Sequence, residues 1–265
     1  MWVFTSIVLM SKLTILASSY KAEKYLKEYF NSAENQIFKD FEITCEAVQP
    51  SPQELKIYNK AVKKYSFINL KIHNEKISLP EAWNKSLNRS KSELICIWNL
   101  DDLRTIDSLL KMVNVFQQDK SIEFLYGNYT VVNKFKKTRG NYINESGREN
   151  ELKKSMILGP FFMFRRTVLE KVGFFDEQLI SGADYDFAMR LARSCKGQHL
   201  DHNLGFYLNN RSGLSTKSDS LQEIERTVVE IRYNLEIINK SLIKKAQSMY
   251  NISQYNFNDK FEDIM

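Results

Sequence analysis

Strand-like and helix-like hydrophobic patterns alternate along the first half of this chain, and no other feature limits its possible folds as strongly. The apolar run LTILAS (13–18) is typical of a buried strand, and residues 22–30 then carry apolar side chains at helical spacing. Further strands are expected at 41–47, 67–72 and 94–98, each followed by a helical stretch. Because parallel strands need crossover connections, this repeat predicts βαβ units and a mainly parallel sheet flanked by helices.

Local signals mark where several of the helices begin. Ser51, Pro52 and Glu54 form a capping box with proline at the first helical position. Thr105 stands where it would cap the helix that follows the fourth strand. Four further segments complete the expected core: a strand at 122–133, the apolar segment 161–164, a helix near 167–171 and another that opens near Asp184.

Two segments leave their roles open. The polar stretch 134–158 is interpreted either as a solvated loop or as a mobile lid over a phosphorylated ligand. Apolar residues with heptad spacing predict a long C-terminal helix, which either packs on its own domain or joins two copies: Leu221, Ile224, Val228, Ile231, Leu235, Ile238 and Leu242. The expected division is an apolar arm or upstream start at 1–9, one domain at 10–218 and a helical extension at 219–265.

Composition excludes several classes of protein. With 17 Phe, 13 Tyr and 3 Trp among 265 residues, the chain is too apolar to be disordered. The net charge of +6 suits an anionic partner, but the basic residues are scattered, which disfavours a dedicated nucleic-acid binder. Cys45, Cys96 and Cys195 lie far apart without a C-x-x-C pair, so we expect free thiols and a cytoplasmic location. Peripheral contact with an acidic membrane at its inner face is compatible with the charge.

Polar side chains gather where the expected strands end, which is where open α/β sheets bind their ligands. They are Ser19 and Tyr20 after the first strand, Glu46 after the second, and Asn99, Asp101 and Asp102 after the fourth. The adjacent carboxylates of Asp101 and Asp102 suit a divalent cation such as Mg²⁺ or Mn²⁺, which would bridge to substrate phosphates. Helix capping explains the same residues, and spacing alone leaves the two interpretations equally open.

Asp184 is a second chemically suggestive carboxylate, in the segment GADYD at the start of an expected helix. It could cap that helix. It could also act as a general base, provided that it lies within hydrogen-bond reach of an acceptor hydroxyl.

Four segments follow one another in an order that resembles the family 2 glycosyltransferases, over about residues 12–215. They are LTILASSYKAEKYL, PEAWNKSLNRSKSELICIWNLDD, GPFFMFRRTVLEKVGFFDEQL and GADYDFAMRLA. The resemblance implies a GT-A fold at 10–218, which is a Rossmann-like, mainly parallel sheet flanked by helices. It also implies an inverting enzyme of the hexosyltransferase type. Such an enzyme moves a sugar from a nucleotide-diphosphate sugar to a glycan or glycolipid, in synthesis of cell-surface polysaccharide or lipopolysaccharide.

The resemblance also assigns roles to individual residues. Asp101 falls on the second acidic position of the D-x-D motif, which holds the divalent cation against the donor diphosphate, and Asp102 is the adjacent candidate ligand. Asp184 falls on the aspartate that resembles the catalytic base of inverting members. The remaining contacts implied for the nucleotide sugar are Ser19, Tyr20, Glu46, Asn84 and Asn99.

The chain departs from the family pattern at four positions. Asn99 replaces the first Asp of D-x-D, Ala183 replaces the Glu before the base, Glu46 stands where Asp is commoner, and Asn210 stands where many relatives carry His. These differences leave open an altered donor, a weakly held cation or an inactive relative that serves as a binding or scaffold protein. A nucleotidyltransferase is disfavoured, because the segment after the first strand has no glycine-rich loop.

Overall fold

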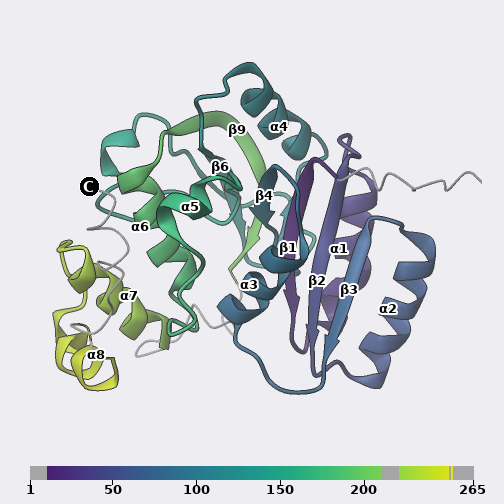
Figure 1. Cartoon of the computed structure of the whole chain (residues 1–265), viewed down its shortest axis with the longest axis horizontal. Helices are drawn as coiled ribbons and strands as arrows, with labels where there is room; N and C mark the ends of the chain where they lie inside the picture. The colour runs from purple at the N-terminus through teal and green to yellow at the C-terminus, as the bar shows by residue number, and fades with distance from the viewer. Residues whose placement is uncertain (1–10, 210–220, 251, 253–265) are drawn as a thin grey trace, which may run out of the picture.

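The computed structural model of the chain describes residues 11–209, 221–250 and 252. Residues 1–9 and Asn210, both considered above, lie outside these ranges. Within them a nine-stranded sheet has the order β3-β2-β1-β4-β8-β6-β9-β5, with β7 paired to β6 (Figure 1). No helix in the described ranges has the length and apolar character needed to cross a bilayer.

The first half of the sheet is the parallel βαβ arrangement that the sequence predicts. Its strands pair in parallel and are β1 (Leu13–Ser19), β2 (Phe41–Val48), β3 (Ile68–His73) and β4 (Leu94–Ile97). The crossover helices are α1 (Glu23–Glu34), α2 (Pro52–Lys64) and α3 (Leu79–Arg89). The capping box at Ser51 and Glu54 is confirmed, and Ser78 and Glu81 form a second one at the start of α3.

The second half of the sheet is mixed. β8 (Met163–Arg165) lies antiparallel between β4 and β6 (Phe124–Val132), and β9 (Gly197–Leu208) runs parallel to β6. β9 and the short β5 (Leu103–Arg104) were not expected from the sequence. Part of the polar stretch 134–158 is also ordered as β7 (Asn141–Ile143), because it pairs with β6.

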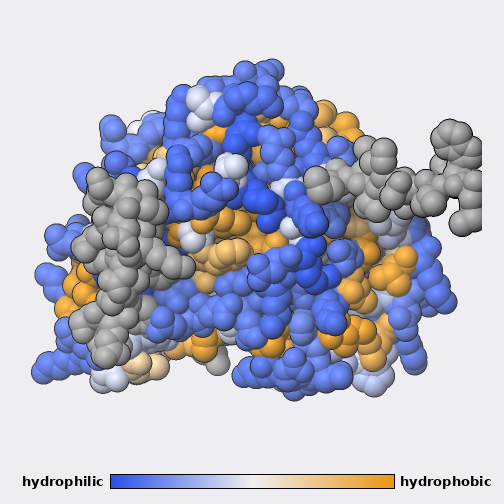
Figure 2. Space-filling view, in the orientation of Figure 1, coloured by the Kyte–Doolittle hydropathy of each residue, from blue (hydrophilic) through white to orange (hydrophobic). Residues whose placement is uncertain are grey.

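Two buried hydrophobic clusters lie on opposite faces of the sheet, because successive side chains of a strand point to opposite sides. Ile15 joins one cluster and Leu16 the other. The first face is covered by α1, α2 and α4 (Ser108–Gln118), and the second by α3, α5 (Val168–Val172) and α6 (Ala183–Ser194). Hydrophilic residues dominate the surface in Figure 2, with apolar areas scattered between them.

The heptad segment does not form one continuous helix, so that expectation is wrong. α7 (Leu221–Arg232) ends early, Asn234 adopts a positive φ of 50°, and α8 (Ile243–Met249) follows a short 3₁₀ turn. Ile224, Val228 and Leu242 are buried in a third cluster beside α6, whereas Ile238 is 66% exposed. The apolar spacing therefore reflects two short elements that pack on the domain; the division at 219 stays a prediction.

Candidate functional site

The sequence-predicted site residues converge on the carboxyl edge of the sheet. β1 to β4 run in one direction, and β6 and β9 share it because the antiparallel β8 lies between β4 and β6. The arrowheads of β1 to β3 point to this edge at the bottom of Figure 1. α6 ends just before β9 begins, so it runs back against the strands and starts at the same edge. Topology therefore places Asp101, after β4, and Asp184, at the start of α6, at one edge of the sheet.

The acidic turn after β4 is tied to the end of β9. Asp102 is 1% exposed, and its Oδ1 accepts the N–H of Leu208 at 3.0 Å. Its backbone carbonyl accepts the indole N–H of Trp98 at 3.0 Å. Burial and the neighbouring charge of Asp101 raise the pKa of Asp102 well above its usual value, and the Leu208 N–H and the Asn99 side chain oppose that rise. Burial also raises the pKa of Asp101.

The structure decides against helix capping at this turn. α4 begins at Ser108, and Asp107 at its N-cap position makes no side-chain cap. The carboxylate of Asp102 accepts from β9 instead, and the Thr105 hydroxyl donates to the carbonyl of Asn203. The expected cap at Thr105 is therefore wrong, because β9 takes up both polar groups.

Asp101 and Asp102 fit a divalent cation as a two-carboxylate donor set. Oδ2 of Asp102 is buried and has no hydrogen-bond partner in the described part of the chain. No group of three or more His, Cys, Asp or Glu residues in the described ranges could hold a metal ion. Mg²⁺ commonly binds through one or two carboxylates and takes its other ligands from water and substrate phosphates, so the residues match a site that the substrate completes.

Asp184 lies in the first turn of α6 rather than at its N-cap. The N-cap residue is Gly182, which has no side-chain cap, so the capping interpretation of Asp184 is wrong. Oδ1 of Asp184 accepts its neighbour's N–H, from Tyr185, at 2.8 Å. Burial raises the pKa of Asp184 to about 6, and the charge of Glu225 adds to the rise. A carboxylate with this pKa is ionised at neutral pH and still basic enough to take a proton.

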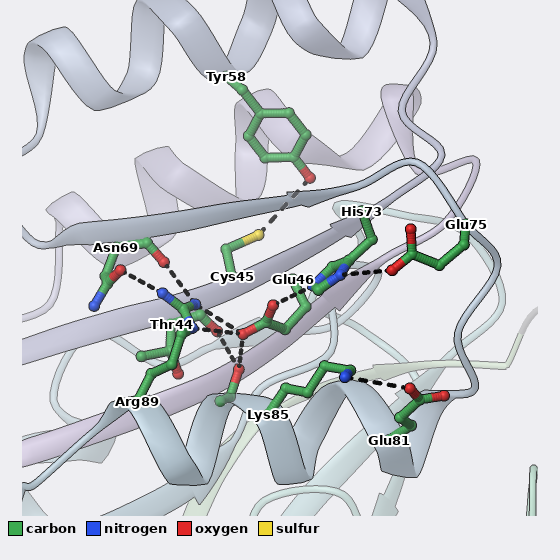
Figure 3. A network of polar contacts seen from close by, with 11 residues as sticks. Thr44, Cys45, Glu46, Tyr58, Asn69, His73, Glu75, Glu81, Lys85 and Arg89 are labelled. Carbon is green, nitrogen blue, oxygen red and sulfur yellow. Dashed lines mark hydrogen bonds and ion pairs between the residues drawn. The ribbon is translucent and has the colours of Figure 1, made fainter.

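Glu46 is held in a buried polar network (Figure 3). One carboxylate oxygen accepts from Arg89 Nη2 at 2.7 Å and from the Ser86 hydroxyl at 3.0 Å. The other lies 2.6 Å from Nε2 of His73. Glu46 thus joins β2 to β3 and α3, and its oxygens are already bonded within the protein. Sequence reasoning missed His73, although it ends a strand as Glu46 nearly does.

The other predicted nucleotide contacts differ in how accessible they are. The Asn84 amide donates to the carbonyl of Phe175 at 2.9 Å and accepts its N–H at 3.0 Å, so it holds the loop after α5 against α3. Ser19 is buried at the end of β1. Tyr20 is 47% exposed, with the ammonium of Lys21 5.2 Å from its ring. Tyr20 is therefore the most accessible of these three side chains.

Comparison with known proteins gives a consistent answer. The model of the family described as Glycosyl transferase family 2 matches residues 14–173. An uncharacterized glycosyltransferase of Methanocaldococcus jannaschii, MJ1057, is 26% identical over 187 residues, which are 66% of this chain and 62% of that protein. The probable glycosyltransferase YdaM of Bacillus subtilis is 23% identical over 74% of this chain and 48% of its own length. The chain thus spans less than two thirds of these relatives.

Solved structures show the same fold. Staphylococcus aureus TarS 1–349 in complex with UDP superposes with a TM-score of 0.63 at 18% identity, over 90% of this chain and 69% of TarS 1–349. The mannosyltransferase PcManGT of Pyrobaculum calidifontis, in complex with GDP-Man and Mn²⁺, gives 0.61 at 13% identity, over 85% of this chain and 64% of its own. The architecture is GT-A, a mainly parallel central sheet flanked by helices.

Proposed function

This chain belongs to glycosyltransferase family 2, and on that premise we propose that it transfers a sugar from a nucleotide-diphosphate sugar to an acceptor hydroxyl, with inversion. The observation that carries the proposal is topological: strand order puts the turn after β4 and the start of α6 at the same edge of the sheet. The paired Asp101 and Asp102 suit the donor diphosphate, and Asp184 suits the acceptor. UDP in TarS and GDP-Man in PcManGT support a nucleotide-sugar donor.

The donor side is proposed to hold a divalent cation. Asp101 and Asp102 would be its protein ligands, and Asn99 would supply a neutral oxygen nearby. When bound, Mg²⁺ or Mn²⁺ neutralises the charge that develops on the diphosphate leaving group. The bond from Leu208 to Asp102 holds one carboxylate oxygen in place, and the other oxygen is buried without a hydrogen-bond partner in the described part of the chain. The Mn²⁺ in the PcManGT complex supports the use of a divalent cation.

On the acceptor side Asp184 is proposed as the general base. An oxygen of Asp184 takes the proton of the acceptor hydroxyl as that hydroxyl attacks the anomeric carbon. The bond from this carbon to the diphosphate oxygen breaks, and its electron pair leaves with the nucleotide. Attack opposite the leaving group inverts the sugar centre. Since the pKa of Asp184 is about 6, the residue is ionised at pH 7.5 and ready to accept the proton.

A glycan or glycolipid acceptor in cell-surface polysaccharide synthesis is the proposed context. The relatives include a hyaluronan synthase of Pasteurella multocida, 23% identical over 95% of this chain and 24% of its own length. The net charge of +6 suits an acidic acceptor or an acidic lipid surface that carries it. The second candidate function is a catalytically inactive binding protein, which the replacement of acidic residues by Asn99 and Ala183 favours.

Sugar release from a panel of UDP- and GDP-sugars, with Mn²⁺, separates the two candidates. We expect turnover with one donor, and loss of about 10²–10⁴-fold of kcat in Asp184→Asn with donor affinity retained. Asp119→Asn is the matched control, because the Asp119 side chain is 47% exposed and lies a few residues before β6, at the opposite edge of the sheet. No turnover with any donor contradicts the enzyme proposal. Equal turnover in wild type and Asp184→Asn removes Asp184 from the mechanism.

A further inference from the structure

The loop that leads into α6 is bound by a carboxylate from a distant helix. Glu225 lies on α7 and is 0% exposed. Its Oε1 accepts the backbone N–H of Ile180 at 2.9 Å, and its Oε2 accepts those of Ser181 at 2.6 Å and Gly182 at 2.7 Å. The hydroxyl of Tyr250 also donates to Oε1. Consecutive backbone N–H groups that converge on one anion form a strong and directional anchor.

This anchor lies immediately before the proposed base. Gly182 is the N-cap of α6, its carbonyl accepts the N–H of Asp186 at 3.0 Å, and Asp184 follows two residues later. Glycine fits here because a Cβ on Gly182 would come within 3.0 Å of Cβ of Glu225. Helix and loop thus approach each other closely. A shift of the 180–182 backbone would move the first turn of α6 and the carboxylate of Asp184 with it.

A second residue of α7, Arg232, binds the same part of the chain on either side of residues 180–182. Nη1 of Arg232 lies 3.0 Å from Oδ2 of Asp176 and 2.7 Å from Oδ1 of Asp186. All three side chains are buried. Arg232 therefore holds both ends of the segment from Asp176 to Asp186, and Glu225 holds its middle. α7 lies beyond residues 14–173, where the family model matches.

We propose that Glu225 is a positioning residue for catalysis, which sets the place of Asp184 by anchoring the backbone of residues 180–182 to α7. This inference rests on the proposed function, since it assumes that Asp184 is the base. Glu225 does not itself contact the substrate in this assignment. It acts through three backbone hydrogen bonds, and α7 becomes part of the acceptor side of the enzyme.

Glu225→Gln is the critical variant. Both oxygens of Glu225 accept hydrogen bonds from backbone N–H groups, so an amide in either orientation turns its NH₂ towards at least one such donor. We expect kcat to fall about 10- to 100-fold, the cost of a displacement on the order of 1 Å, with the donor KM unchanged. The acid limb of the pH profile should move to lower pH, because the charge of Glu225 raises the pKa of Asp184. The other nearby carboxylate of α6, Asp186, is bound to Arg190 and Arg232.

Glu230→Gln is the matched control. Glu230 is also a buried carboxylate of α7, 2% exposed, but it binds Arg226 and the N–H of Ile238 instead of the 180–182 loop. A loss of packing in α7 would affect both variants alike. Glu225→Asp should restore part of kcat, because a shorter carboxylate still accepts from several N–H groups.

Two measurements that need no turnover complete the test: amide hydrogen exchange at 180–182 and NMR titration of the Asp184 carboxyl. If wild type turns over no donor, the proposed function fails, and these measurements still report on the anchor. Faster exchange at 180–182 and a lower Asp184 pKa in Glu225→Gln, but not in Glu230→Gln, support the positioning role of Glu225. Unchanged exchange and titration, or equal kcat and pH profiles in Glu225→Gln and Glu230→Gln, overturn the positioning role.

Discussion

Replacing Asp184 by Asn should stabilise the fold while it removes the proposed base. Burial raises the pKa of Asp184 from 3.8 to about 6, so its ionised form is disfavoured in the native state. A difference of about two pKa units corresponds to about 3 kcal/mol, at about 1.4 kcal/mol per unit. Because the side chain is partly exposed, solvent screening reduces this value, and we expect about 1–2 kcal/mol. Asparagine is neutral and can still accept the N–H of Tyr185.

The sign of the effect depends on pH. Between pH 3.8 and about 6 the native Asp184 keeps a proton that the unfolded chain has lost, so its contribution to stability falls as the pH rises. Above about pH 6 the carboxyl is ionised in both states and the full cost is present. The advantage of Asp184→Asn should therefore be small at pH 4 and largest above pH 6.

Urea denaturation of wild type and variant at pH 4 and pH 7.5 measures this difference. We expect Asp184→Asn to be more stable than wild type at pH 7.5. In thermal unfolding, its melting temperature should be higher by about 2–8 °C, from about 2–4 °C per kcal/mol for a chain of this size. Asp119→Asn is the control, and it should make the protein less stable at pH 7.5. Hydrogen bonds from Ser121 lower the pKa of Asp119, so its ionised form is favoured in the native state. A variant that is no more stable than wild type at pH 7.5, or whose advantage is the same at both pH values, would refute the reasoning.

Three further changes test other parts of the molecule. Arg232→Met removes a guanidinium that lies between the buried carboxylates of Asp176 and Asp186. Arg190 still pairs with Asp186, so chemical denaturation should show a loss of about 3 kcal/mol, mainly from Asp176, and a loss below about 1 kcal/mol would contradict it. Gly205→Ala places a Cβ 2.6 Å from the ring of Phe161 and should cost about 1–3 kcal/mol by the same method, whereas an unchanged midpoint would show that β9 relaxes freely. Asp101→Asn should weaken Mn²⁺ binding in the presence of UDP, measured by electron paramagnetic resonance; unaltered binding would exclude Asp101 as a ligand.

The parallel half of the fold was predictable because its strands carry local hydrophobic patterns, and β1 and β4 are continuous apolar runs. LTILAS and LICI are buried on both faces, so their patterns need no knowledge of their neighbours. β9 was missed because its sequence, GQHLDHNLGFYL, mixes polar and apolar residues without a clean period. β7 is three residues within a polar segment, and it forms only because β6 offers an edge. Such strands depend on tertiary pairing more than on local pattern.

The C-terminal prediction failed for a different reason. Apolar spacings of three and four describe any helix with one buried face, whether it is long or interrupted. The spacing continues past Arg232, although the chain leaves the helix there and Asn234 adopts a positive φ. Periodicity gives the face of a helix but not where it stops when no proline or glycine marks the end.

The sequence also predicts some features of the candidate site and misses others. The place of Asp101 was predictable, because it follows an apolar parallel strand, β4. The place of Asp184 was expected from the family resemblance alone, because β9, which shows the direction of α6, was missed. The partners of each carboxylate were not predictable, because they come from elements far away in sequence. The bond of Asp102 to Leu208, and that of Glu225 to the 180–182 loop, appear only in the folded chain.

Both partners come from the C-terminal third of the chain. Leu208 on β9 and Glu225 on α7 both lie C-terminal to residues 14–173, where the family pattern matches. The first holds a proposed cation ligand and the second holds the backbone that leads to the proposed base. The parallel half thus supplies the acidic turn proposed for the donor side, while the C-terminal third supplies the proposed base and the groups that hold both sites in place. Because the base depends on α7 for its position, local unfolding of α7 should abolish turnover before the sheet itself unfolds.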